Sequence, residues 1–269
     1  GSSSISLSGF NRPIDFGTTY TQTINRNLNA GTSSITCTGF LNGGINLIGG
    51  GKTFYNVTIT LPGTGTGITG GLNLNQINGN NTFNNLTITI TSGSPGTHNI
   101  NLVENQTVTG TFSFSGPSIT SRAFLLSNIQ GTPRTVTAAT ITANNCDFRD
   151  ITISGAASPI SPTSAGDCGG NTNITFPATK TVYWNLAGTQ NWSATGWATS
   201  DGGTPASGNF PLVQDTVVFT DAGSAGIVST NGPFNIGTVD MSGRTSALRI
   251  DTSEFSSLIH GNWTNGSGT

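Results

Sequence analysis

The sequence has very few charged residues. Lysine, arginine, aspartate and glutamate make up 7% of its 269 residues, whereas a typical soluble domain has roughly a quarter. The nine basic residues stand singly, so no basic cluster is present to neutralise phosphates, and we expect no nucleic-acid binding. The protein must therefore owe its solubility to serine, threonine, asparagine and glycine. These residues suit strands that stack in register, where like charges would repel one another.

Long apolar runs are also missing. The sequence has neither a run of roughly 18 apolar residues nor a charged segment followed by an apolar one at its start, so we expect no membrane insertion. The chain does not begin with methionine, and it stops at Gly268-Thr269 just after an expected strand. We therefore expect it to be a piece of a longer protein.

Histidine and cysteine are scarce. His98 and His260 are far apart in the sequence, so we expect no metal site and no cofactor. Cys146 and Cys168 flank a loop rich in glycine, proline and serine and could form a disulfide, whereas Cys37 has no evident partner. None of the usual local signatures of a calcium loop, a nucleophile elbow or a phosphate-binding loop occurs.

What the sequence does contain is a repeated unit: a phenylalanine, two further residues and a short alternating strand. It occurs as GKTFYNVTIT (51–60), NNTFNNLTIT (80–89) and NCDFRDITIS (145–154). Such self-similarity is typical of solenoids, in which each unit buries its apolar face by stacking on its neighbours. Disorder is the competing interpretation of this composition, but β-branched and aromatic residues at alternating positions argue against it. We expect an all-β protein, a parallel β-helix or β-solenoid, with almost no helix.

The spacing of apolar residues within the unit predicts a corner. Phe54 and Val57 are three residues apart, which would place them on opposite faces of an uninterrupted strand, yet both are typical core residues. We therefore expect a turn at Tyr55-Asn56, because Asn and Asp tolerate left-handed backbone angles. One straight strand holding both Phe54 and Val57 would contradict the β-helix. The predicted corner residues are Phe54 and Asn56, Phe83 and Asn85, and Phe148 and Asp150, with Asn56, Asn85 and Asp150 at equivalent backbone positions.

The composition changes near residue 178. Residues 155–170 form a loop rich in glycine, alanine and proline, and a tryptophan-rich segment begins at Thr181. We expect a repeat-containing β-helix at 1–178 and a second β module, truncated, at 179–269. The second module could be another β-helix or a β-sandwich, since Asn231-Gly232 is a dipeptide that makes tight hairpin turns.

Two tryptophans are the best candidates for ligand recognition. Trp192 and Trp197 lie among small polar residues in NWSATGW, and an exposed indole is a good stacking platform for a sugar ring. The alternative is that Trp184, Trp192 and Trp197 pack together and seal the boundary between the modules. We favour this alternative, because large aromatic side chains are usually mostly buried.

Asp147 and Asp150 form the one carboxylate pair that merits comparison with glycosidases. Glycoside hydrolysis needs two carboxyl groups roughly 5 to 10 Å apart across a sugar cleft. The corresponding positions of the first unit hold Thr53 and Asn56. The repeat therefore predicts a structural corner role for Asp150, and we expect no enzymatic activity.

Several segments carry a resemblance to known proteins. They are AGTSSIT (30–36), GGGKTFYNVTIT (49–60), NNTFNNLTIT (80–89), NQTVTGTFSFSG (105–116), NCDFRDITISGA (145–156), DCGGNTNITF (167–176) and the tryptophan-rich segment 181–219. These segments resemble the repeat-rich β-helical proteins of phage virions, found in tail fibres and related appendages, and of large bacterial surface proteins.

The resemblance implies a structural or adhesive segment of a phage tail fibre or decoration protein at the virion surface, in contact with host surface polysaccharide. The alternatives are an adhesin stalk at the bacterial cell surface and, behind it, a polysaccharide-degrading tailspike. Because fibres of this type are often homotrimers, the implied partners are further copies of the chain and other virion proteins.

Overall fold

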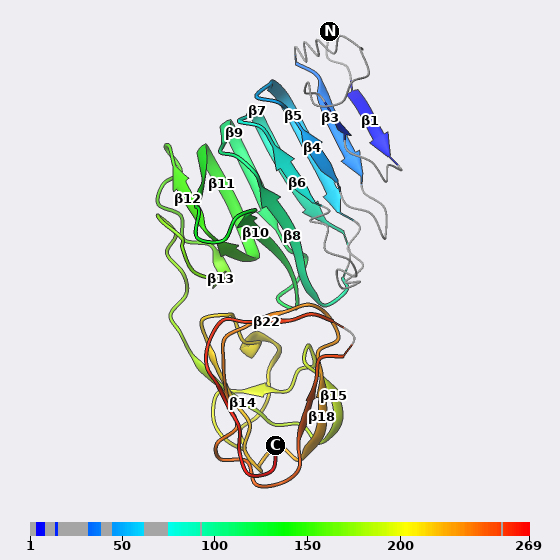
Figure 1. The fold of residues 1–269 in the computed structure, drawn as a ribbon, viewed down its shortest axis with the longest axis vertical. Coiled ribbons are helices and arrows are strands. Elements are labelled where there is room, and N and C mark those ends of the chain that lie inside the picture. The colour runs from blue at the N-terminus through cyan, green and yellow to red at the C-terminus, as the bar shows by residue number, and fades with distance from the viewer. Residues whose placement is uncertain are drawn as a thin grey trace.

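The structure is a computed structural model that describes residues 4–8, 14–15, 32–38, 45–61, 75–91, 93–253 and 255–269. It confirms the all-β prediction: the described residues form strands and one short 3₁₀ helix, η1 (Ser207–Asn209). Two sets of stacked strands lie one below the other along the longest axis of the molecule (Figure 1). Among the described residues there is no helix of the length and hydrophobicity that a membrane span requires.

The first solenoid (4–176) is a parallel β-solenoid of about eight turns. Its first ladder contains β1 (Ser4–Ser8), β3 (Ser34–Thr38), β5 (Thr53–Leu61), β7 (Thr82–Ile90), β9 (Gln106–Ser115) and the first part of β11 (Arg134–Arg149). Its second ladder contains β2 (Ile14–Asp15), β4 (Asn46–Ile48), β6 (Gln76–Asn78), β8 (Gly96–Leu102), β10 (Ser121–Ser127) and the end of β11. A further turn is added by β12 (Ile151–Ser154) and β13 (Thr163–Asp167), which both pair with β11.

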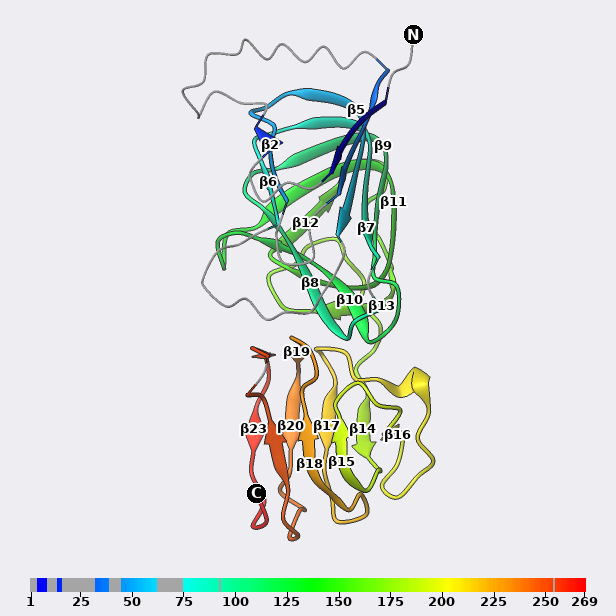
Figure 2. The ribbon, with the colours of Figure 1, turned by 90° about the vertical axis from the view of Figure 1, so that its right-hand side faces the viewer.

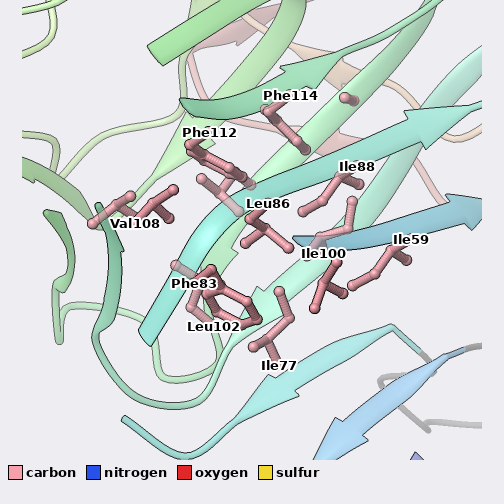
Figure 3. Close-up of a cluster of buried hydrophobic side chains, with 14 of the residues drawn as sticks. Ile59, Ile77, Phe83, Leu86, Ile88, Ile100, Leu102, Val108, Phe112 and Phe114 are labelled. Carbon is pink, nitrogen blue, oxygen red and sulfur yellow. The ribbon is translucent and has the colours of Figure 1, made fainter. Parts of the chain in front are cut away.

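The core lies between the two ladders. Inward residues alternate with outward threonines, so each turn presents apolar side chains on one side only. Leu86 and Ile88 of the first ladder meet Ile100 and Leu102 of the second in one cluster (Figure 3). Burial of such side chains contributes roughly 1.5–3 kcal/mol each relative to exposure, which is the main stabilisation of the turns.

The predicted corner is correct in register but not in form for the first two units. Asn56 pairs with Asn85, and Phe54 pairs with Phe83, whose rings stack with centroids 5.4 Å apart. Phe54 and Val57 are both buried, but they lie in one continuous strand, β5, and neither Asn56 nor Asn85 has a positive φ. The inward alternation shifts by one residue at Tyr55-Asn56 without ending the strand. Strand continuity is therefore no evidence against a solenoid, contrary to our expectation.

The third unit does not match the first two. Phe148 pairs with Leu125 of β10 and so lies on the second ladder. Asp150 has a φ of 55° at the turn between β11 and β12. The prediction that Asp150 is equivalent to Asn56 and Asn85 was wrong, because the third unit begins at a different point of the turn. The left-handed angle predicted for the corners is found only at Asp150 among these three residues.

The strands of the second solenoid (181–264) belong to three small sheets. The first sheet holds β14 (Thr181–Trp184), β17 (Thr216–Val218), β20 (Thr238–Asp240) and β23 (Trp263–Thr264), with β16 (Trp197–Ala198) antiparallel to β14. The second holds β15 (Gly188–Asn191), β18 (Ala225–Ser229) and β21 (Arg249–Asp251), and the third holds β19 (Asn235–Ile236) and β22 (Leu258–Ile259).

Parallel pairing decides between the two folds considered for this module. Among the described residues, the strands of this module pair in parallel except for β14 with β16, which is the pattern of a solenoid and not of a sandwich. The strands on either side of Asn231-Gly232, β18 and β19, belong to different sheets, so this dipeptide makes no hairpin. The strands β14, β17, β20 and β23 lie side by side in Figure 2.

The two solenoids do not share an axis. In Figure 1 the first solenoid is seen from the side, with its strands stacked across the page, whereas the second is seen nearly end-on. The second solenoid lies against one side of the first, near the starts of β8 and β10 (Figure 2). The chain therefore forms a bent body and not one straight rod.

Candidate functional site: the junction between the two solenoids

Strand β10 is buried on both of its faces. All seven of its residues are buried. Ala123 and Leu125 pack into the core of the first solenoid, whereas Phe124 and Leu126 pack on the other face with Val213. Val213 precedes β17 of the second solenoid, so the second solenoid covers the outer face of β10. β10 is thus the central strand of the junction.

A buried ion pair lies beside this apolar contact. Arg122 of β10 and Asp147 of β11 are 3% and 1% exposed, and Nη2 of Arg122 is 2.6 Å from Oδ1 of Asp147. The Nε of Arg122 donates to the same oxygen at 2.9 Å, and Nη2 also donates to the carbonyl oxygens of Cys146 and Ser164. The other oxygen of Asp147 accepts a hydrogen bond of 2.9 Å from Nδ2 of Asn235, in the second solenoid. Both oxygens of this carboxylate are therefore engaged.

The polar contacts continue to His260, the residue that follows β22. Nε2 of His260 lies 3.2 Å from Oδ1 of Asn235, so a chain of hydrogen bonds runs from Arg122 through Asp147 and Asn235 to His260. The His260 side chain is largely exposed, and its partial desolvation at the junction lowers its pKa below the ordinary value, while the charge of Asp147 raises it and that of Arg149 lowers it. Because Nδ2 of Asn235 already donates to Asp147, its Oδ1 accepts the hydrogen bond from Nε2 of His260.

Backbone groups complete the junction at its two ends. At one end, the backbone N–H of Thr97 donates to the carbonyl oxygen of Pro233 at 2.6 Å. Gly96 fits here because a Cβ would lie 2.6 Å from Cδ of Pro233. At the other end, Gln214 donates to the carbonyl oxygen of Ala165 and accepts from the N–H of Asp167.

The junction is built to hold the two solenoids together. A buried charge is costly unless it is paired and hydrogen-bonded, and the bonds of Asp147 come from both solenoids. Separation would strip this carboxylate of Asn235 and expose the outer face of β10. A general base or nucleophile needs a free atom directed at substrate, and neither oxygen of Asp147 meets that need.

The predicted carboxylate pair does not face a sugar cleft. Asp150 is 4% exposed, accepts a hydrogen bond from the N–H of Gly131 at 2.9 Å and lies 3.8 Å from Nε of Arg149. Asp147 is directed into the junction. The two carboxylates therefore serve separate buried contacts.

The predicted glycan-stacking residues are buried. Trp192 and Trp197 are each 1% exposed, and their rings meet at a centroid distance of 4.9 Å in the core of the second solenoid. Trp184 packs edge-on against Trp197 at 4.8 Å, and Nε1 of Trp197 donates to the carbonyl oxygen of Trp192. Neither indole offers a face to a sugar. The favoured packing of the three rings is observed, although they fill a module core and do not seal the boundary.

The predicted disulfide is not formed. Cys146 and Cys168 are free, buried thiols, as is Cys37. Cys146 points into the core of the first solenoid, whereas Cys168 lies with Phe124 and Val213 at the junction. Burial raises the pKa of Cys37 to about 11 and that of Cys146 to about 12. These thiols are therefore unreactive near neutral pH.

The junction residues were not predicted from the sequence. Arg122, Asn235 and Gln214 carry no local motif, and nothing in the sequence pairs residue 122 with 147 or 235. One signal was present: Ala123–Leu126 is a run of four apolar residues without alternation, which is typical of a strand buried on both faces. In a chain where the other strands alternate, this run marks the covered strand.

Comparison with protein families, curated proteins and solved structures finds no match to this chain. Within the described ranges, no three His, Cys, Asp or Glu side chains are grouped so as to hold a metal ion.

Proposed function

We propose that this chain is a structural segment of a surface appendage, in the first place a phage tail fibre or decoration protein. The observation that carries the proposal is the junction, in which an apolar cluster and a saturated buried ion pair hold two solenoids at a fixed angle. A buried polar network that is fully hydrogen-bonded makes such a joint rigid.

The solenoids themselves support a mechanical role. Each turn of the first solenoid pairs with the turn before and the turn after it through parallel strands. A load along the axis is therefore shared among many backbone hydrogen bonds, and lateral edges are absent along the length of the ladders. The outward side chains are mostly threonine, serine and asparagine. They keep the surface polar without like-charge repulsion between turns.

The geometry favours a rigid elbow over the straight stalk that the repeats alone suggest. Because the second solenoid packs on the side of the first, the appendage would change direction at this segment (Figure 1). The proposal includes no enzymatic step. Both oxygens of Asp147 are hydrogen-bonded within the junction, and Asp150 accepts a hydrogen bond from the N–H of Gly131 at a turn. A stalk on a bacterial cell surface would use the same mechanics.

Antibody labelling separates these placements. Antibody against residues 181–269 is applied to purified virions and to uninfected cells from cultures that carry the gene, with preimmune serum as the control. We expect gold label on virion fibres seen by electron microscopy. Label on uninfected cells alone would replace the virion placement with a bacterial stalk, and recovery of the chain only as a free soluble protein would overturn both.

A further inference from the structure

The outward face of the first ladder carries a regular two-dimensional array of small polar side chains, all but one of them with a hydroxyl group. Thr36, Thr58, Thr87, Ser113 and Thr142 pair in one continuous row across β3, β5, β7, β9 and β11. Two residues further along the same strands, a second row holds Thr38, Thr60, Thr89, Ser115 and Asn144. The backbone register of β1 continues both rows to Ser6 and Ser8.

This array is uncovered and uncharged. None of the residues in the two rows from β3 to β11 is buried, and none carries a charge. Figure 2 shows the first ladder along the right-hand side of the first solenoid, with no described segment beyond it. The second solenoid covers β10 of the other ladder and leaves this face open.

The array has two fixed spacings. Neighbouring rungs of a sheet are roughly 4.8 Å apart, and residues i and i+2 on one strand are roughly 6.7 Å apart. The strands β3, β5, β7 and β9 run in nearly the same direction in Figure 1, so these spacings repeat over the whole face. Faces of hexagonal ice also repeat their oxygen atoms in two perpendicular directions, at comparable distances. We propose that this threonine array binds the surface of ice.

The chemistry of the side chains suits a lattice of water molecules. A hydroxyl group both donates and accepts a hydrogen bond, as a water molecule does, and the methyl group of threonine adds an apolar surface beside it. Threonine is β-branched and stiff at χ1, so the array is ordered before it binds. Ser113 and Thr142 show this order directly, since their hydroxyl oxygens are 2.9 Å apart.

The same features argue against a sugar or a protein as the ligand. Sugar sites usually offer an aromatic face for stacking, and neither row contains an aromatic residue. Protein interfaces have an apolar centre, whereas every side chain in the two rows is polar. A repeating, uncharged ligand surface of hydrogen-bonding groups fits both observations.

The test compares two threonine substitutions. The variant Thr58→Tyr/Thr87→Tyr places bulky rings at neighbouring rungs in the middle of the array. The control Thr216→Tyr changes an outward threonine of β17 that pairs with Thr181 and Thr238 on the second solenoid. Tyrosine is favoured in strands, so both variants should keep the fold, as circular dichroism can verify.

Ice crystals grown slowly in dilute protein, and an assay of ice recrystallisation, measure the binding. We expect the parent chain and the Thr216→Tyr variant to enter the ice and to arrest recrystallisation, and the Thr58→Tyr/Thr87→Tyr variant to lose both effects. Exclusion of the folded parent chain from ice would overturn the proposal. So would equal activity of the two variants, or sedimentation with crystalline cellulose or chitin in the absence of any effect on ice.

Discussion

Asp147 links a buried ion pair of the first solenoid to a hydrogen bond from the second. Its carboxylate is 1% exposed, pairs with Arg122 of the first solenoid and accepts a hydrogen bond from Asn235 of the second. Burying two charges costs much of what their attraction returns, so the value of the pair lies in its geometry. Removing one partner, however, leaves the other charge buried and unpaired.

The variant Asp147→Ala should therefore be strongly destabilised, by about 3–5 kcal/mol as for other broken buried ion pairs. Urea unfolding followed by tryptophan fluorescence measures the loss. The matched control is Asp251→Ala, which removes the partner of Arg249, a side chain 66% exposed; its unfolding midpoint should stay close to that of the parent. Equal midpoints for the two variants would show that the buried pair stabilises nothing.

The three thiols provide a second test at this scale. Because burial raises the pKa values of Cys37, Cys146 and Cys168, the folded protein should not react with a disulfide reagent at pH 8. After unfolding in guanidinium chloride without reductant, all three thiols should react. A count of one thiol instead of three would mean that two of the cysteines are bonded.

His98 should make the protein sensitive to acid. Burial lowers its pKa below the ordinary value of 6.5, and a hydrogen bond with the backbone of Ser94 raises it in part. The folded state therefore binds its proton less readily than the unfolded state, so stability is fully present above pH 6.5 and falls as the pH decreases below it.

We expect the thermal midpoint to decrease between pH 7 and pH 5, and the decrease to be smaller in His98→Gln. Differential scanning calorimetry at several pH values measures both. The variant His260→Gln serves as the comparison, because His260 is largely exposed and its loss should change the pH profile less than the loss of His98 does. Parallel pH profiles for the parent chain and His98→Gln would contradict the assignment.

At the scale of strands, repeat spacing and side-chain parity predict local pairing well. The pairings of Phe54 with Phe83 and of Asn56 with Asn85 follow from the aligned units, because the same number of residues separates the two members of each pair. Phe148 does not follow, because the turns between the second and third units shift the phase of the repeat. Two-sided burial of β10 also depends on a segment nearly 90 residues away, at Val213, which no local pattern specifies.

The phenylalanine stack within the first ladder should be energetically important. Phe83 is fully buried and stacks on Phe54 of the preceding turn. We expect Phe83→Ala to destabilise the protein by about 3–5 kcal/mol, through lost burial and the cavity that remains. Denaturant unfolding measures the change, with Tyr55→Ala as the control on the same pair of strands, since Tyr55 is 36% exposed. Similar losses for both variants would contradict the described core.

At the scale of the whole molecule, two solenoids with different turns form one bent body. The first has two long ladders, and the second has three short sheets. The repeat pattern of neither solenoid predicts the angle between them. That angle follows from contacts at the junction, which involve β10, Asp147 and Asn235. The tryptophans show the same limit, because their spacing indicates an aromatic cluster but not which core it fills.

Small-angle X-ray scattering of the intact chain in solution tests the central claim, that the junction fixes the two solenoids as one rigid elbow. We predict a single distance distribution that matches the docked arrangement of Figure 1 and does not change with salt. Leu126→Glu, which places a charge in the apolar contact at the junction, should shift the distribution to longer distances. Scattering from the parent chain that requires two bodies at variable separation would contradict the account.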